Sequence, residues 1–167
     1  DNFLFNISIK ENIRMGNPCA TDEEVLAAAK AARCDEFISK MEYGYDTLVG
    51  DAGGKLSGGE RQRITIARAM LKPADVVILD EASAYADPEN EVYIEEAINE
   101  LVKGKTLIVV AHRLETIENS DKIVVVDQGK IVAEGTQNEL LESCSLYKRL
   151  WNETILTSER KRGDCNA

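Results

Sequence analysis

The amino-acid sequence predicts an α/β protein in which a helical part precedes a part built on a mainly parallel sheet. The sheet is predicted from apolar runs that are continuous rather than alternating, as in strands buried on both faces. These runs are Val76–Leu79, Leu107–Ala111 and Ile123–Val126. The helical part is predicted from the apolar spacing between about residues 10 and 71, where strand patterns are few.

Helix-start signals organise the first part of the chain. Thr21 and Glu24 have the spacing of a capping box, in which each side chain binds the backbone amide of the other residue. The helix that follows carries one apolar face, formed by Val25, Ala28, Ala29 and Ala32. Cys34–Met41 is predicted as a further short helix, and Glu42–Lys55, which is rich in glycine and tyrosine, as an ordered loop.

Strands alternate with helices in the second part. Asp87 is suited to cap a helix whose first turn contains Pro88. The apolar side of that helix consists of Tyr93, Ile94, Ala97, Ile98 and Leu101. Asp127–Lys130 is predicted as a hairpin turn into a further strand. Closing helices are predicted at Thr136–Leu141 and Leu146–Trp151, and the polar chain from Ser158 is expected to be disordered.

Composition excludes several classes of function. Hydrophobic residues at 44% and charged residues at 30% are typical of a globular protein. The net charge of -10 and the pI of about 4.7 argue against a nucleic-acid partner, which requires a basic surface. No apolar stretch approaches the roughly 20 residues that cross a bilayer, so a membrane role would come through a partner segment.

The cysteine and histidine content disfavours a zinc site. The four cysteines are widely scattered, at Cys19, Cys34, Cys144 and Cys165, and form no C-x-x-C pair. Because the chain has only one histidine, few residues could serve as ligands of a Cys/His metal site. We expect the cysteines to be reduced, structural thiols.

The segment Leu56–Glu60 admits two interpretations. Ser57 and Glu60 form a capping box, which explains both residues as parts of a structural helix start. The adjacent Gly58 and Gly59 are not explained in this way, because glycine inside a helix costs about 1 kcal/mol relative to alanine. Two glycines would let a phosphate approach bare amides at the positive end of the helix. The motif alone leaves both interpretations open.

Acidic residues follow the first predicted strand. Asp80 is suited to hold a hydrated magnesium ion, because this hard cation prefers carboxylate and water ligands. Glu81 could polarise the water that attacks a γ-phosphate. An ordinary solvated strand end would explain the same pair. His112 follows the second predicted strand and is expected at the same sheet edge, where open α/β folds bind ligands.

A phosphate-binding loop is absent from the chain. Gly54-Lys55 suggests one, but the pattern G-x-x-x-x-G-K-[ST] fails at both ends. Val49 stands at the first glycine position, and Leu56 replaces the hydroxyl residue that would bind magnesium.

Taken together, these motifs resemble the nucleotide-binding (ATPase) domain of ABC transporters of the exporter type, over about residues 3–151. Leu56–Glu60 is similar to the family signature, Val76–Glu81 to the Walker B strand, Ala84–Asp87 to the D-loop and His112 to the switch histidine. The segment from Phe3 to Ile13 is similar to the stretch after the Q-loop. Val49–Gly53 corresponds to the place where exporters contact their membrane domain.

The resemblance implies a partial domain with a RecA-like P-loop NTPase core and an ABC α-helical subdomain. Residues 1–151 would form it, with the helical subdomain at about 10–72, the RecA-like part at 73–151 and a polar tail at 152–167. The Walker A loop, the adenine-stacking aromatic residue and the Q-loop glutamine would all precede Asp1. We therefore expect a chain truncated after the Q-loop, which is inactive alone but belongs to an ATPase.

The resemblance also implies cofactors and partners. ATP and Mg²⁺ would be bound, with Leu56–Glu60 and Asp87 contacting the nucleotide, Asp80 holding Mg²⁺ through water, and Glu81 and His112 as catalytic residues. A second nucleotide-binding domain would pack head-to-tail, and a transmembrane domain fused upstream would place the chain at the cytoplasmic face of the cell membrane.

The identity of the transported substrate and two alternative functions remain open. In the D-loop, Tyr85 and Ala86 depart from the usual small-then-leucine pair. The stretch Asp87–Glu91, with Tyr85 and Ala86 before it, is similar to that of exporters that handle iron–siderophore complexes. One alternative is a non-transport ABC ATPase, against which the acidic balance and the Val49–Gly53 and Phe3–Ile13 segments argue. The other is a non-catalytic interaction module that keeps the fold without the chemistry.

Overall fold

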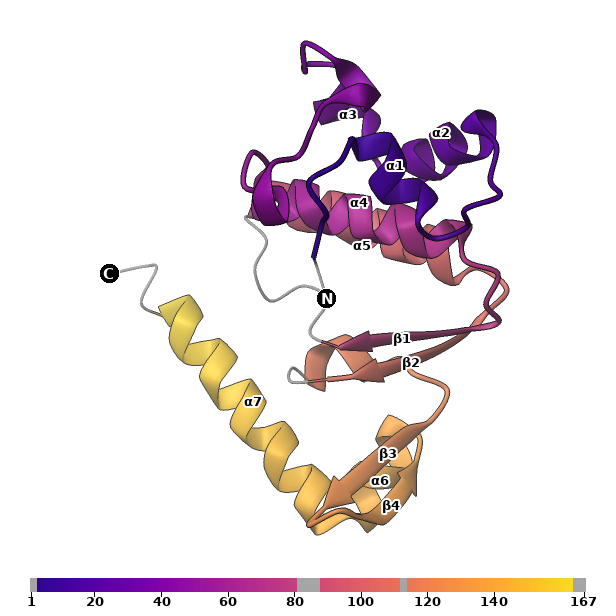
Figure 1. Cartoon of the computed structure of the whole chain (residues 1–167). Helices are drawn as coiled ribbons and strands as arrows, with labels where there is room; N and C mark the ends of the chain where they lie inside the picture. Colours follow the sequence, from indigo (N-terminus) through magenta and orange to yellow (C-terminus); the bar gives the residue numbers. More distant parts are fainter. Residues whose placement is uncertain (1–2, 81–87, 112–113, 164–167) are drawn as a thin grey trace. The chain divides into compact units, whose positions relative to one another are not determined.

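The computed structural model describes residues 3–80, 88–111 and 114–163 (Figure 1). Its elements fall into two compact units, Asp1–Ile108 and Val109–Ala167. The border predicted between a helical part and a RecA-like part, at residues 72–73, lies within the first unit and stays a prediction. Among the described residues, none of the helices combines the length and the apolar composition of a bilayer-spanning segment.

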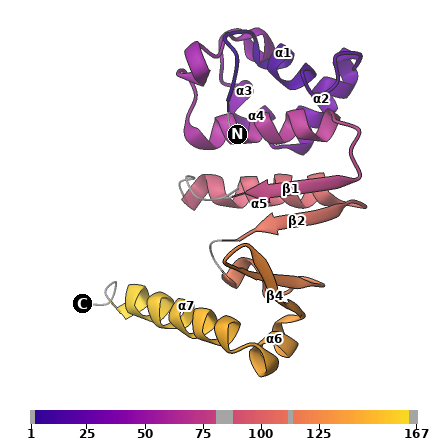
Figure 2. The same ribbon diagram turned by 60° about the horizontal axis from the view of Figure 1, so that its bottom comes forward.

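Five α-helices of the described chain lie in the first unit (Figures 1 and 2). They are α1 (Ile9–Arg14), α2 (Asp22–Ala31), α3 (Asp35–Ile38), α4 (Gly58–Leu71) and α5 (Pro88–Val102). Between α3 and α4 the chain forms an ordered loop, as predicted, with two short 3-10 turns, η1 (Gly44–Asp46) and η2 (Asp51–Gly53).

The capping box predicted at the start of α2 is confirmed. Glu24 Oε2 accepts from the Thr21 amide at 2.8 Å, and Thr21 Oγ1 accepts from the Glu24 amide at 3.3 Å. Ser8 caps α1 in a simpler way, because its hydroxyl accepts from the Glu11 amide at 3.2 Å. These local contacts explain why the helices begin where the sequence predicts.

One apolar core joins the helices of the first unit. It includes Ile13 of α1, Val25 of α2, Ile64 of α4 and Ile94 of α5, all fully buried. The helices also approach closely at Gly16, where a built Cβ would lie only 2.0 Å from the carbonyl oxygen of Arg68. Glycine is thus required at this position because any side chain would collide with the backbone of α4.

Helices α1 to α4 are followed by a two-stranded parallel sheet of β1 (Val76–Asp80) and β2 (Thr106–Val110), which α5 connects (Figure 1). The first unit ends within β2, at Ile108. Val77 packs against the core of the unit, but Ile78 and Ile108 are 67% and 49% exposed. The expectation that these strands are buried on both faces is therefore wrong for the described chain. Continuous apolar runs require two covering layers, and the described residues supply too little to cover both faces.

The second unit holds an antiparallel hairpin of β3 (Ile123–Asp127) and β4 (Lys130–Gly135). The predicted turn is confirmed, with Gln128 and Gly129 at φ 47° and 75°, the left-handed values of a two-residue hairpin loop. In the described residues β3 pairs with β4 and with no parallel neighbour. The prediction of Ile123–Val126 as a strand buried in a parallel sheet is thus wrong here.

Helices close the second unit. The hairpin is preceded in the chain by a 3-10 turn, η3 (Leu114–Ile117). It is followed by two helices, α6 (Gln137–Ser143) and α7 (Ser145–Gly163). Leu140 and Tyr147 are buried with the inner face of β3. The disorder predicted from Ser158 is wrong as far as Gly163, because α7 continues to that residue. The sequence from Ser158 to Gly163 is rich in arginine, lysine and glutamate, which have high intrinsic helix propensity.

Candidate functional site

The start of α4 is the best-defined part of the candidate site. Ser57 adopts extended φ and ψ of -65° and 164° and caps the helix. Its hydroxyl accepts from the Glu60 amide at 3.2 Å, and Glu60 Oε2 accepts from the Ser57 amide at 2.7 Å. Leu56 and Gly59 are buried, so they anchor the turn on either side of the cap. The structural interpretation of Ser57 and Glu60 is confirmed.

The two glycines of this turn have free donors. A helix start leaves four amides without intrahelical acceptors. The capping box uses those of Ser57 and Glu60, so the amides of Gly58 and Gly59 remain for an acceptor from outside the described chain. Both belong to a helix of 14 residues, whose dipole favours an anion at this end. This arrangement suits a phosphate oxygen.

A tightly folded loop leads into α4. Gly50 and Gly53 have φ of 78° and 76°, and Ala52 has φ of 50°, which is unusual for a residue with a side chain. Arg61 fastens the loop, because its Nη1 donates to the Leu56 carbonyl at 2.8 Å. Asn6 Nδ2 donates to Asp51 Oδ1 at 2.9 Å from the N-terminal segment. The loop therefore presents Ser57 in one defined position.

The acidic strand end lies in the same unit as α4. Asp80 is the last residue of β1 and is exposed. In Figure 1 the carboxyl end of β1 and the start of α4 lie on the same side of the unit. Glu81, Asp87 and His112 lie outside the described residues, so their predicted roles stay predictions.

The described residues form no protein-only metal site. Among residues 3–80, 88–111 and 114–163, no three His, Cys, Asp or Glu side chains gather as ligands. Mg²⁺ does not need such a cluster, because it keeps several waters and is usually held by one or two carboxylates together with phosphate oxygens. The exposed carboxylate of Asp80 fits this mode of binding.

Sequence reasoning missed a buried polar clamp between the N-terminal segment and α4. Asn12 is fully buried; its side chain donates to the carbonyls of Phe5 and Ser8 at 3.0 Å and accepts from the Phe5 amide at 3.0 Å. Arg68 of α4 donates to the Asn12 carbonyl at 2.8 Å and to Oδ1 at 3.1 Å. Arg68 also donates to the Phe3 carbonyl at 3.1 Å. Asn12 lies four residues after Ser8, the cap of α1, a spacing that could have suggested this role.

The clamped segment displays exposed apolar side chains. Phe3 and Phe5 meet edge to face with ring centroids 5.0 Å apart and are 48% and 46% exposed. Ile7, in the same segment, and Leu48, which forms a short bridge with Ser8, are 37% and 55% exposed. We call Phe3, Phe5, Ile7 and Leu48 the apolar patch. Ordered apolar groups of this kind mark an interaction surface.

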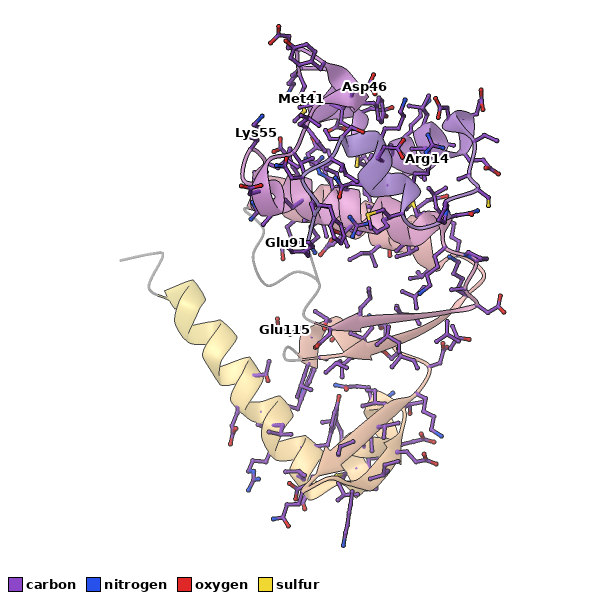
Figure 3. All side chains as sticks on the ribbon, in the orientation of Figure 1. Arg14, Met41, Asp46, Lys55, Glu91 and Glu115 are labelled. Carbon is purple, nitrogen blue, oxygen red and sulfur yellow. The ribbon has the colours of Figure 1, made fainter. Side chains whose placement is uncertain are left out.

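Ion pairs join α1 to α2 and η1. Lys10 Nζ lies 3.6 Å from Asp22 Oδ2 and 3.5 Å from Asp46 Oδ1, and Arg14 also binds Asp22. Of these residues, Arg14 and Asp46 are labelled in Figure 3. The hydrogen bond from Arg14, together with the charge of Lys10, lowers the pKa of Asp22. The charges of Asp22 and Asp46 raise the pKa of Lys10. These pairs fix the α1–α2 corner that supports the clamp.

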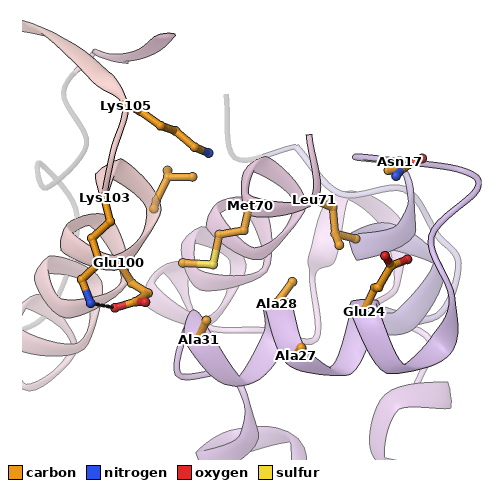
Figure 4. Close-up of a pocket in the computed structure, with 11 residues that line it drawn as sticks. Asn17, Glu24, Ala27, Ala28, Ala31, Met70, Leu71, Glu100, Lys103 and Lys105 are labelled. Carbon is orange, nitrogen blue, oxygen red and sulfur yellow. Dashed lines mark hydrogen bonds and ion pairs between the residues drawn. The ribbon is translucent and has the colours of Figure 1, made fainter. Parts of the chain in front are cut away.

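A hollow of about 480 Å³ is lined by residues other than those of the candidate site (Figure 4). Its walls come from α2 and the late parts of α4 and α5, including Ala28, Met70 and Leu101. Lys103 forms an ion pair with Glu100 at its rim. It contains none of the predicted site residues, so we assign the candidate site to the start of α4 and the end of β1.

Comparison with known proteins shows the family of the chain. The family model described as ABC transporter matches residues 1–84, which is 84 of the 167 residues. The chain is 48% identical over 158 residues to an uncharacterized ABC transporter ATP-binding protein of Sinorhizobium fredii. It is 52% identical over 151 residues to YgaD of Bacillus subtilis, a protein named provisionally as a multidrug export ATP-binding/permease protein.

A solved structure is similar over most of the chain. The structure of a bacterial Atm1-family ABC exporter with ATP bound matches with a TM-score of 0.80 and 42% identity, over 90% of this chain and 26% of that one. The alignments with the two relatives cover 95% and 90% of this chain. The chain spans about a quarter of the length of those relatives, 27% and 26%. From its motifs, its fold and these matches, the chain belongs to the ABC transporter family.

Proposed function

We propose that the chain is the part of an exporter's ATPase domain that completes an ATP site and hydrolyses ATP to drive transport. The observation that carries this proposal is the pair of free amides of Gly58 and Gly59 at the start of α4. They are presented by a rigid capping box in the same unit as the acidic end of β1. Phosphate oxygens are the ligands that this arrangement fits best.

Each site residue then has a physical role. The amides of Gly58 and Gly59 would receive phosphate oxygens of an ATP held by a second domain packed head-to-tail. Asp80 would hold Mg²⁺ through a water molecule, and Asp87 would contact the nucleotide at the domain interface. Glu81 would accept the proton of the attacking water, and His112 would hold that water in place. Magnesium-bound ATP supplies the phosphoanhydride bond whose cleavage releases the free energy.

Two further features bear on the ATP affinity of the chain and on its membrane partner. The sequence contains no G-x-x-x-x-G-K-[ST] segment, so the chain alone should bind ATP weakly, and micromolar binding in calorimetry would overturn this expectation. The apolar patch offers a transmembrane domain a docking surface supported by the Asn12–Arg68 clamp. The chain would then lie at the cytoplasmic face of the cell membrane.

The decisive experiment grafts this chain into YgaD in place of the 151 matching residues and measures ATP hydrolysis. The unsubstituted chimera should hydrolyse ATP. Glu81→Gln should reduce kcat by about 10³-fold or more, because the attacking water loses its base. The control Glu142→Gln removes an exposed carboxylate of α6 and should leave kcat unchanged. Near-normal turnover by Glu81→Gln would remove Glu81 from the catalytic role.

A second pair of variants separates the ligand role of α4 from its structural role. Gly58→Asp and Gly58→Asn add side chains of almost the same shape, and only the first adds a charge. Asp in a first turn favours the helix, so the fold should not suffer from the charge. If the turn receives phosphate, Gly58→Asp should lose far more activity than Gly58→Asn. Equal activities would mean that the amides contact no anion.

The alternative functions predict different results. A non-catalytic module would fold in the chimera but leave it without ATP hydrolysis. A non-transport ATPase would hydrolyse ATP without coupling it to a membrane domain. The names of the relatives favour export, because YgaD is named for multidrug export. An iron–siderophore substrate stays a prediction from the stretch Asp87–Glu91 with Tyr85 and Ala86 before it.

A further inference from the structure

Arg63 is a charged side chain that α4 buries rather than exposes. Only 4% of the residue is accessible to solvent, and its neighbours in sequence, Gln62 and Ile64, are buried as well. Burying a cation costs free energy unless the surroundings compensate with paired charges and hydrogen bonds. The compensation here comes from several elements at once, and this connects parts of the unit that are distant in sequence.

Two aromatic rings face the Arg63 guanidinium. Its Cζ lies 5.0 Å from the ring centroid of Phe37, in α3, and 5.3 Å from that of Tyr93, in α5. Both distances are in the range of favourable cation–π contacts. The planar guanidinium is suited to this role because it stacks on rings while its edge still donates hydrogen bonds.

The edge of the guanidinium binds the turn between α2 and α3. Nη1 donates to the Arg33 carbonyl at 3.0 Å and lies 3.9 Å from Glu36 Oε2. Arg33 has φ of 57°, an unusual value for a residue with a side chain. The Arg33 side chain also reaches α5, since its Nε lies 2.9 Å from Glu96 Oε2. Both arginines therefore tie the helical elements to α5.

The contact with α5 lies near the start of both helices. Arg63 and Tyr93 are each the sixth residue of their helix, counted from Gly58 and Pro88. Farther along, α4 and α5 meet through apolar groups such as Ala67 and Ala97. Apolar packing has no preferred direction, whereas a guanidinium over a ring sets both distance and orientation.

We propose that Arg63 is a positioning residue: through Tyr93 and Phe37 it sets the start of α4 relative to the start of α5. It thereby fixes the orientation of the turn that presents the Gly58 and Gly59 amides. The functional half of this inference rests on the proposed ATP site, but the structural half does not. Arg63 itself is buried and is not assigned to touch nucleotide.

The first test is hydrogen exchange of the chain itself, in Arg63→Met, Arg63→Lys and the control Ile64→Val. The control weakens the packing of the same helix and leaves the Arg63 guanidinium and both rings in place. Arg63→Met should speed exchange in the first turns of α4 and α5 by about tenfold more than near Leu101, from losing two ring contacts and a hydrogen bond. Arg63→Lys should recover part of the protection. Uniform acceleration in Arg63→Met, as expected for Ile64→Val, would overturn the proposal.

The second test uses the YgaD chimera. Arg63→Met should lower kcat by about tenfold or more while the KM for ATP changes less than about twofold, because a misaligned site loses transition-state contacts first. Unchanged kcat, or a rise in KM alone, would overturn the functional half of the proposal. If the unsubstituted chimera were inactive, the proposed function would fail, and the exchange experiment would still decide the role of Arg63.

Discussion

Replacing Asn12 by leucine tests whether the polar clamp holds the N-terminal segment on α4. The two side chains have similar volumes, and leucine is the better helix former, so intrinsic propensity favours the variant. The substitution removes hydrogen bonds to the amide and carbonyl of Phe5, to the Ser8 carbonyl and from Arg68. Each unsatisfied buried group costs about 1–3 kcal/mol, and because Phe5 is half-exposed we expect a total loss of about 3 kcal/mol.

The assay is urea unfolding of the chain followed by far-UV circular dichroism. The only tryptophan, Trp151, lies in the second unit, so its fluorescence would not report on the clamp. Asn17→Leu is the matched control, because within the described chain the Asn17 side chain makes one exposed hydrogen bond, in which Oδ1 accepts from the Cys19 amide at 3.1 Å. It should change the free energy of unfolding by less than about 1 kcal/mol. A loss below about 1 kcal/mol in Asn12→Leu would refute the reasoning.

Three further predictions concern packing, thiol reactivity and acid stability. Gly16→Ala should destabilise the first unit by about 2 kcal/mol or more in urea unfolding, because its Cβ would lie 2.0 Å from the Arg68 carbonyl oxygen. Burial raises the pKa of the Cys34 thiol to about 12, so iodoacetamide at pH 8 should modify it only as fast as the unit opens. Asp22→Asn should lower the urea midpoint at neutral pH, where Asp22 is ionised and bound to Arg14. That difference should vanish as the pH falls through the lowered pKa of Asp22, below about 4, because both folded and unfolded forms are then protonated.

Each of these predictions has a control within the chain. Gly104→Ala places Cβ in open space and bears only the strain of φ at 71°, so it should cost less than Gly16→Ala. The exposed Cys19 should react promptly under conditions that leave Cys34 unmodified. Lys122→Gln removes an exposed ion pair of the second unit, in which Lys122 Nζ lies 3.0 Å from Glu134 Oε2. The change in urea midpoint that it causes should not show the acid dependence expected for Asp22→Asn. Equal behaviour of variant and control would contradict the corresponding prediction.

Local signals in the sequence predicted the helix starts and the hairpin. Thr21 and Glu24 lie within one turn of each other, and so do Ser57 and Glu60, so each capping box is encoded without knowledge of the fold. The turn at Gln128 and Gly129 is likewise local, because its left-handed backbone suits glycine. These elements required no information from distant parts of the chain.

The sequence could not predict features that depend on distant partners. The Arg68 side chain meets Asn12 across 56 positions, and Arg63 meets Arg33 across 30. The exposure of Ile78 depends on which layer covers the sheet, and the apolar run itself indicates only that a cover is needed. The length of α7 was missed because a polar helix lacks the apolar periodicity on which the prediction relied.

The first turn of α4 limits how this chain can be engineered for heat resistance. Ordinary improvements of a helix start replace glycine with a better helix former and add carboxylates to the first turn. At Gly58 and Gly59 both changes act on the two amides that the capping box leaves free. A screen for thermal tolerance alone would therefore favour changes at the atoms that the proposed chemistry requires. Selection for helix stability would favour residues other than glycine at these two positions, whereas selection for anion binding would keep glycine.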